Sequence, residues 1–176
     1  SRIEFEAEPW PGFLMMDDLE LDHQPHPPVG EGLCYGDCSA ASTLCPCNNC
    51  GSAGEGCGNS NFHGAILSAT GSASASTDSL ILQISQGTSN QPALFFQGQN
   101  FINNGNGVAF GDGLRCCGVV TRLQVSFMDS AGIGRTDVFV AAAGGCVAGD
   151  SRCYQAWYRD PISIGGSPCG TYFNLT

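Results

Sequence analysis

The stretch Cys34-Tyr-Gly-Asp-Cys-Ser-Ala-Ala-Ser-Thr-Leu-Cys-Pro-Cys-Asn-Asn-Cys-Gly-Ser-Ala-Gly-Glu-Gly-Cys57 decides how this chain folds. It holds six of the eleven cysteines, and Leu44 is its only aliphatic residue larger than alanine. So little apolar mass cannot form a hydrophobic core, and covalent cross-links must therefore hold the stretch together. We treat residues 32–60 as a cysteine-rich, cross-linked segment.

Two kinds of cross-link fit this segment, disulfide bonds or a zinc ion bound by thiolates. Cys47-Asn-Asn-Cys50 has the spacing of a zinc-ligand pair, but Cys45-Pro-Cys47 does not, and five further cysteines lie far downstream. A dispersed set of this kind favours a network of disulfides in an oxidising compartment, with no bound metal. We predict at least four intrachain disulfides, drawn from Cys34, Cys38, Cys45, Cys47, Cys50, Cys57, Cys116, Cys117, Cys146, Cys153 and Cys169.

The downstream cysteines allow specific expectations about pairing. Cys146 and Cys153 flank a short turn, so we expect them to lie opposite each other and to form a disulfide. Cys116 and Cys117 are adjacent on a strand and face opposite sides, and we expect one of them to pair with Cys169. Because eleven is odd, one thiol is left over, and we expect it to be Cys116 or Cys117.

The charge balance limits the partners of the protein. Acidic residues number 16 against six basic ones, all arginine, for a formal net charge of −10. Such a surface repels nucleic-acid phosphates, so we expect no nucleic-acid partner. No apolar run approaches the ~20 residues that span a bilayer, so we expect no membrane span. Together with the cysteines, this composition predicts an exported protein, extracellular or on the cell surface.

Residues 61–176 show a β pattern. Short stretches of alternating or apolar residues are separated by Gly, Ser and Asn turns, and no stretch has helical periodicity. We predict an all-β fold, a disulfide-stapled β-sandwich of jelly-roll or immunoglobulin-like kind with an extended N-terminal arm. The expected strands are 65–69, 79–84, 93–97, 107–110, 119–128, 137–141, 147–159 and 171–175.

Residues 1–31 form the N-terminal arm. Ile3, Phe5 and Ala7 alternate with glutamates, which is the pattern of a half-buried strand. This strand is either an edge strand of its own domain or a donor strand that completes a neighbouring subunit. The prolines and acidic residues of 11–31 predict an extended tether that lets the strand reach a neighbour.

Several motifs together resemble a cysteine-rich β-domain that recurs in large secreted or surface proteins of planctomycete-like bacteria. They are Cys34-Tyr-Gly-Asp37, Cys45-Pro-Cys47, Gly56-Cys57-Gly-Asn-Ser60, the strand 93–98, the loop 110–116 and the strand 154–161. The resemblance covers about residues 32–176 and implies an exported, β-rich module without assigned chemistry.

The chain departs from that family pattern in three ways. Cys38, Cys50, Cys146 and Cys153 look like additions, so this copy carries more cross-links. Residues 1–31 lie outside the family domain. Relatives typically carry one more strand after the position of 173–176, and its absence implies a vacant sheet edge that a donor strand could fill.

The sequence offers little that points to catalysis. His63 is the single histidine of the β region and no nucleophile elbow is present, so we expect a structural role for it. Asp112 and Asp160 each lie near an arginine, which favours ion pairs or turn capping over a pair of catalytic carboxylates. His23 and His26 lie in the tether, where a solvated linker is the simpler interpretation than a metal site.

Three further residues and the turns carry weaker signals. Loops around Asp37, Asp112 and Asp150 contain oxygen ligands for calcium, but none matches an EF-hand, and we expect no cofactor. Trp157 and Tyr158 face opposite sides of a strand, and an exposed ring there would suit a polysaccharide. Asn174-Leu-Thr176 is a sequon that makes Asn174 a candidate for glycosylation.

The function that these observations predict is not enzymatic. We expect a structural subunit of an extracellular assembly, which polymerises head to tail with other copies of itself by donating its N-terminal strand. A secreted module that binds polysaccharide or another surface is the alternative.

Overall fold

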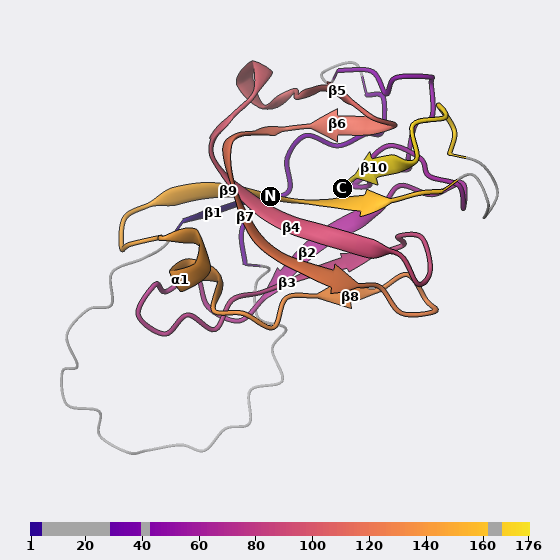
Figure 1. Ribbon diagram of the computed structural model, residues 1–176. Helices are drawn as coiled ribbons and strands as arrows, with labels where there is room; N and C mark the ends of the chain where they lie inside the picture. Colours follow the sequence, from indigo (N-terminus) through magenta and orange to yellow (C-terminus); the bar gives the residue numbers. More distant parts are fainter. Residues whose placement is uncertain (5–28, 40–42, 162–166) are drawn as a thin grey trace, which may run out of the picture.

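The computed structural model describes residues 1–4, 29–39, 43–161 and 167–176 of the chain (Figure 1). Strands account for 39% of the described residues and helices for 6%, so the all-β prediction is confirmed. The strands fall into a five-stranded sheet, a three-stranded sheet and a separate hairpin, and all their pairings are antiparallel.

The five-stranded sheet is built around β9. Its order is β1 (Arg2–Glu4), β9 (Ser151–Arg159), β4 (Pro92–Phe101) and β7 (Cys117–Phe127), and β10 (Phe173–Leu175) also pairs with β9. β10 and β1 lie on the same edge of β9, one after the other. The two strands therefore share one edge of β9, with β1 paired to its first residues and β10 to its last.

The other strands are shorter. The three-stranded sheet has the order β2 (Ile66–Thr70), β3 (Ile81–Ser85) and β8 (Gly134–Arg135). The hairpin consists of β5 (Val108–Phe110) and β6 (Gly113–Arg115), and Figure 1 shows it above β9 and β10. β6 and β8 are the two strands that the sequence pattern did not predict.

The two larger sheets share one hydrophobic core. Leu82 and Ile84 of β3 are buried together with Phe95 of β4 and with Tyr154 and Tyr158 of β9. Each strand contributes every second residue, as its pleat requires. Two sheets thus face each other across a common core, as in a sandwich.

One expected strand is a helix instead. The prediction of a strand over 137–141 is wrong, because α1 (Val140–Gly144) begins there. Three consecutive alanines favour helix, and the carboxylate of Asp78 accepts hydrogen bonds from the backbone N–H groups of Ala141 and Ala142 at 2.7 and 2.8 Å. The cap comes from a residue more than 60 positions away, which no local pattern reveals. The other helix among the described residues is the 3-10 turn η1 (Asn103–Gly105).

The alternation of apolar residues over 119–127 predicts that they share one face of β7, but a bulge in this strand interrupts that face. Val125 pairs with Leu94 and Arg122 pairs with Phe96, so one extra residue stands between them on β7. Val119, Thr121, Leu123, Val125 and Phe127 therefore do not share a single face. Val125 and Phe127 instead lie on the sheet face turned away from the core, and both are exposed.

Candidate functional site

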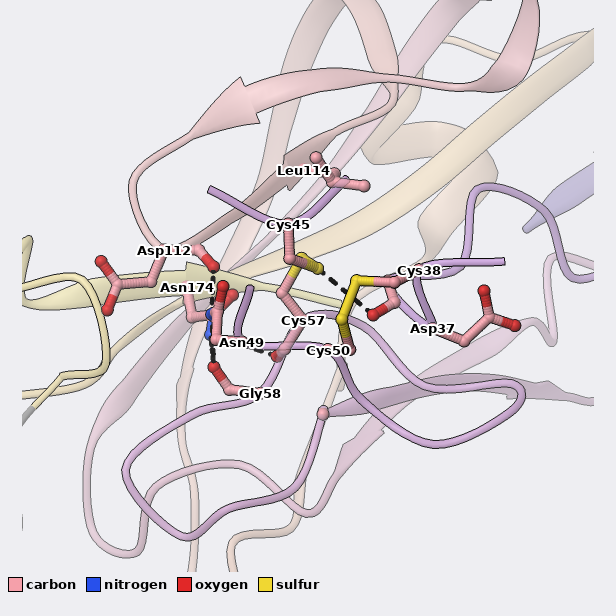
Figure 2. Close-up of a disulfide and its surroundings, with 12 residues drawn as sticks. Asp37, Cys38, Cys45, Asn49, Cys50, Cys57, Gly58, Asp112, Leu114 and Asn174 are labelled. Atoms are coloured by element: carbon pink, nitrogen blue, oxygen red, sulfur yellow. Dashed lines mark hydrogen bonds between the residues drawn. A yellow bond between two sulfur atoms is a disulfide. The ribbon is translucent and has the colours of Figure 1, made fainter. Parts of the chain in front are cut away.

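Five disulfides cross-link the protein, which confirms the prediction of at least four. Two of them, Cys38–Cys50 and Cys45–Cys57, close short loops inside the cysteine-rich segment (Figure 2). Cys45 and Cys57 are buried and form a small core with Leu114 of β6. The cystine sulfur atoms thus take the place of the large apolar side chains that the segment lacks.

Two long-range disulfides tie this segment to the sandwich. Cys34 bonds Cys116, 82 positions away, and Cys47 bonds Cys169, 122 positions away. The segment is therefore anchored both at the start of β7 and at the turn that precedes β10. The described parts of the segment, residues 32–39 and 43–60, pack against the β5–β6 hairpin through the contact of Cys45 and Cys57 with Leu114.

The fifth disulfide corrects an expectation. Cys153 bonds Cys117, and the predicted Cys146–Cys153 pair is wrong. β7 and β9 flank β4, and Gly98 of β4 lies between the two cysteines: a Cβ there would come within 2.7 Å of the Cys117 side chain and 2.9 Å of the Cys153 sulfur. The absent side chain of Gly98 opens the space in which the bridge forms.

The remaining expectations about pairing are also wrong in detail. Cys169 pairs with Cys47, so neither Cys116 nor Cys117 bonds to it, and neither is the leftover thiol. Among the described residues the free cysteine is Cys146. It follows α1 and donates a hydrogen bond to Gln97 Oε1 at 3.2 Å, in place of facing Cys153 across a tight turn.

We expect one reactive thiol per unfolded chain, and a slowly reacting one in the native protein. Burial raises the pKa of the Cys146 thiol, so less thiolate is present near neutral pH. Alkylation followed by mass spectrometry measures both states, with Cys146→Ser as the control that removes the signal. A Cys146→Ser protein that still takes up one label would contradict the pairing.

Asp112 and Asp160 act as buried hydrogen-bond acceptors, which agrees with the turn-capping interpretation. The Asp160 carboxylate accepts hydrogen bonds from the backbone N–H and the hydroxyl of Ser60 and from the hydroxyl of Thr88. The Asp112 carboxylate accepts from Ser167, Cys169 and Thr171, which fixes the turn before β10. Neither forms an ion pair with an arginine of the described chain.

Two asparagines, Asn49 and Asn174, hold the same region together. Asn174 belongs to a sequon, but no sequence motif marks Asn49. Asn49 donates hydrogen bonds to the carbonyl oxygens of Gly58 and Asp112, both at 2.8 Å (Figure 2). Asn174 is fully buried and donates to the carbonyls of Cys57 and Gly58. A glycan on Asn174 is incompatible with this position, so the sequon does not mark a glycosylation site in the folded protein.

The other candidates for chemistry are dispersed. Glu55 accepts hydrogen bonds from the backbone N–H groups of Ser52 and Gly64, and these bonds, with nearby His63, lower its pKa despite the opposing effect of burial. Within the described ranges, no three residues of the His, Cys, Asp and Glu types gather as ligands of a metal ion. Asp37 and Asp150 accept hydrogen bonds from their own turns.

Of the predicted donor strand, only the first residue can be placed. Ile3 lies in β1 and is 1% exposed, packed in the main core of its own domain. The intrachain alternative is therefore the arrangement found in the single chain. Phe5 and Ala7, and also His23 and His26, lie outside the described residues.

Known proteins offer no guide to this arrangement. Comparisons with models of protein families, with curated proteins and with solved structures find no match. The resemblance to a bacterial surface domain thus stays a hypothesis. In the part of the chain that the structure describes, no helix has the length and hydrophobicity to cross a membrane.

Proposed function

We propose that this protein is a non-catalytic structural subunit of an extracellular assembly, whose copies join head to tail by exchanging strand β1. The observation that supports it best is the position of Ile3, which is 1% exposed in the main core. The 24 residues 5–28 separate this strand from the rest of the domain. A core residue on so long a connection can be supplied by a neighbouring copy as readily as by its own chain.

The backbone contacts of β1 can be transferred as a set. β1 pairs with β9 over three residues, and the backbone of Arg2 exchanges two hydrogen bonds with Glu31 at 2.8 and 3.0 Å. Another copy's β1 can make these same bonds, and burial of its isoleucine contributes about 1.5–3 kcal/mol. Exchange therefore changes little in contact energy, and protein concentration decides between the two arrangements.

The connection is long enough for exchange. In an extended conformation, 24 residues reach about 74 Å at ~3.1 Å per residue, which exceeds the width of a domain of this size. The donor strand and the vacated edge of β9 are different surfaces. Successive exchange therefore builds a filament unless the ring closes.

The disulfides support the extracellular part of the proposal. Five bonds in one chain are typical of an oxidising compartment. They also make each subunit resistant to unfolding, which suits a structural protein outside the cell.

Mixing two variants tests the exchange. A labelled chain lacking residues 1–4 has an empty edge on β9, so we expect it to bind the intact chain and to cosediment with it. The matched control is the intact chain with Ile3→Asp, whose strand cannot enter the apolar site and is expected to leave the labelled chain free.

The size of the native protein is the second measurement. Sedimentation of the intact chain should show particles larger than one subunit, and Ile3→Asp should reduce them to single subunits. Leu44→Asp, at an exposed leucine, should leave the particle size unchanged. Monomers at all concentrations, together with no capture of the shortened chain, would refute the proposal.

A further inference from the structure

The outer face of the five-stranded sheet is apolar and only partly covered. Trp157 alternates with the buried Ala156 and Tyr158, so its side chain lies on the face opposite the core. Leu94 pairs with Trp157 and lies on the same face. On the neighbouring β7, Val125 and Phe127 are more than half exposed. Phe110 of the β5–β6 hairpin packs against Trp157 on this face.

A pocket lies between that hairpin and the sheet. Its volume is about 160 Å³, below the ~300–1,000 Å³ that drug-sized ligands occupy, so it has room for a single ring. Leu94 and Phe96 of β4 line it, and the wall consists of Phe110 and Trp157. Two arginines, Arg115 of β6 and Arg122 of β7, complete the lining together with aliphatic residues.

The aromatic wall is a fixed array. The ring centres of Phe110 and Trp157 are 5.8 Å apart, edge to face, and Phe173 lies 5.3 Å from Trp157. The Arg115 guanidinium lies 5.4 Å from the centre of the Phe110 ring, a cation–π contact that orients it. Rings and cation are thus positioned before any ligand arrives, which lowers the entropic cost of binding.

The polar groups of the pocket side chains are all donors. Arginine and the indole of tryptophan donate hydrogen bonds and accept none. Arg115 Nε and Trp157 Nε1 are both buried, and neither has a hydrogen-bond partner in the described structure. A buried donor without an acceptor is costly and calls for a partner that the chain does not provide.

The charge of the pocket is opposite to that of the protein. The chain has a net charge of −10 with only six arginines, yet two of these line one small pocket. Neither Arg115 nor Arg122 has a carboxylate within 4.0 Å in the described part of the chain. The missing partner therefore brings acceptor atoms, a negative charge and an apolar ring face.

We propose that this pocket binds a uronic acid residue of an acidic polysaccharide. The sugar carboxylate would be held by the guanidinium groups of Arg115 and Arg122, in the paired geometry that arginine offers to carboxylates. The apolar face of the sugar ring packs against the aromatic wall. Because β1 is not part of the pocket, this binding is independent of strand exchange and would attach the assembly to an anionic matrix.

Titration calorimetry of the full chain with polygalacturonic acid tests the proposal. We expect saturable binding that Arg115→Gln and Arg122→Gln each weaken by about tenfold or more, since each removes a charge-assisted hydrogen bond. Arg135→Gln removes an exposed arginine on the other sheet and is the control, with an unchanged dissociation constant. The carboxyl-reduced polymer should fail to bind.

Three results would overturn the proposal. They are equal weakening by all three arginine variants, equal binding of the reduced polymer, and no binding of the acid polymer. A peptide of residues 10–22, which is acidic and apolar, provides a further comparison. If the peptide occupies the pocket and the polymer does not, the ligand is the chain's own arm.

Arg122 is exposed, so Arg122→Gln should fold normally and circular dichroism verifies that it does.

Discussion

Replacing Cys47 and Cys169 by serine is expected to lower the free energy of unfolding by about 5 kcal/mol, the largest loss from any one disulfide. The bond joins positions 122 residues apart, and the entropy that a cross-link removes from the unfolded chain grows with the loop that it closes. The Cys38–Cys50 bond closes a loop of only 12 residues, so its removal is expected to lower the free energy of unfolding by about 3 kcal/mol.

Chemical denaturation of the two double-serine variants beside the parent measures the difference. Both variants remove one disulfide and introduce two serines, so the comparison isolates loop length. Equal losses of free energy would show that local packing of the cystines, and not the constraint on the unfolded chain, determines their contribution.

Replacing Asp160 by alanine is expected to lower the free energy of unfolding by about 4 kcal/mol. The carboxylate is fully buried and accepts hydrogen bonds from the Ser60 backbone N–H at 2.9 Å, from the Ser60 hydroxyl and from the Thr88 hydroxyl at 2.9 Å. The alanine leaves three buried donors without an acceptor, at a cost of about 1–3 kcal/mol each before the site relaxes.

Two variants sharpen this measurement. Asp160→Asn keeps the shape and one acceptor oxygen, so its loss should be about half as large. Asp137→Ala removes a carboxylate from an exposed position, where substitutions usually change stability by about 0.5 kcal/mol or less. A loss from Asp160→Ala no larger than that from Asp137→Ala would contradict the structural role assigned to the buried carboxylate.

The strand pattern was readable from the sequence because it depends on local alternation. Tyr158 in the core and Trp157 on the opposite face follow directly from the pleat of β9. The strands β6 and β8 were not predicted, because each begins with a glycine, which in a sequence indicates a turn. α1 was misread because its cap, Asp78, comes from a distant loop.

The candidate sites were less predictable than the fold. The role of Asn49 rests on a contact with Asp112, 63 positions away, and no local motif marks it. Arg115 and Arg122 reach the same pocket only because the hairpin folds over the sheet. Side chains that come together only in the folded chain have no fixed spacing in the sequence, so their contact cannot be predicted from it.

The amino-acid sequence alone requires that covalent bonds replace a core in residues 32–60, because the segment has almost no apolar side chains to bury. The local alternation of residues 61–176 likewise suffices to predict their all-β character. Which cysteines meet is a property of the folded chain. Cys153 bonds Cys117 across β4 because Gly98 leaves room between them. Cys146 follows α1, stays free and donates a hydrogen bond to Gln97. Disulfide pairing depends on distances of a few ångströms between strands far apart in the chain, and those distances exist only once the sheets have formed.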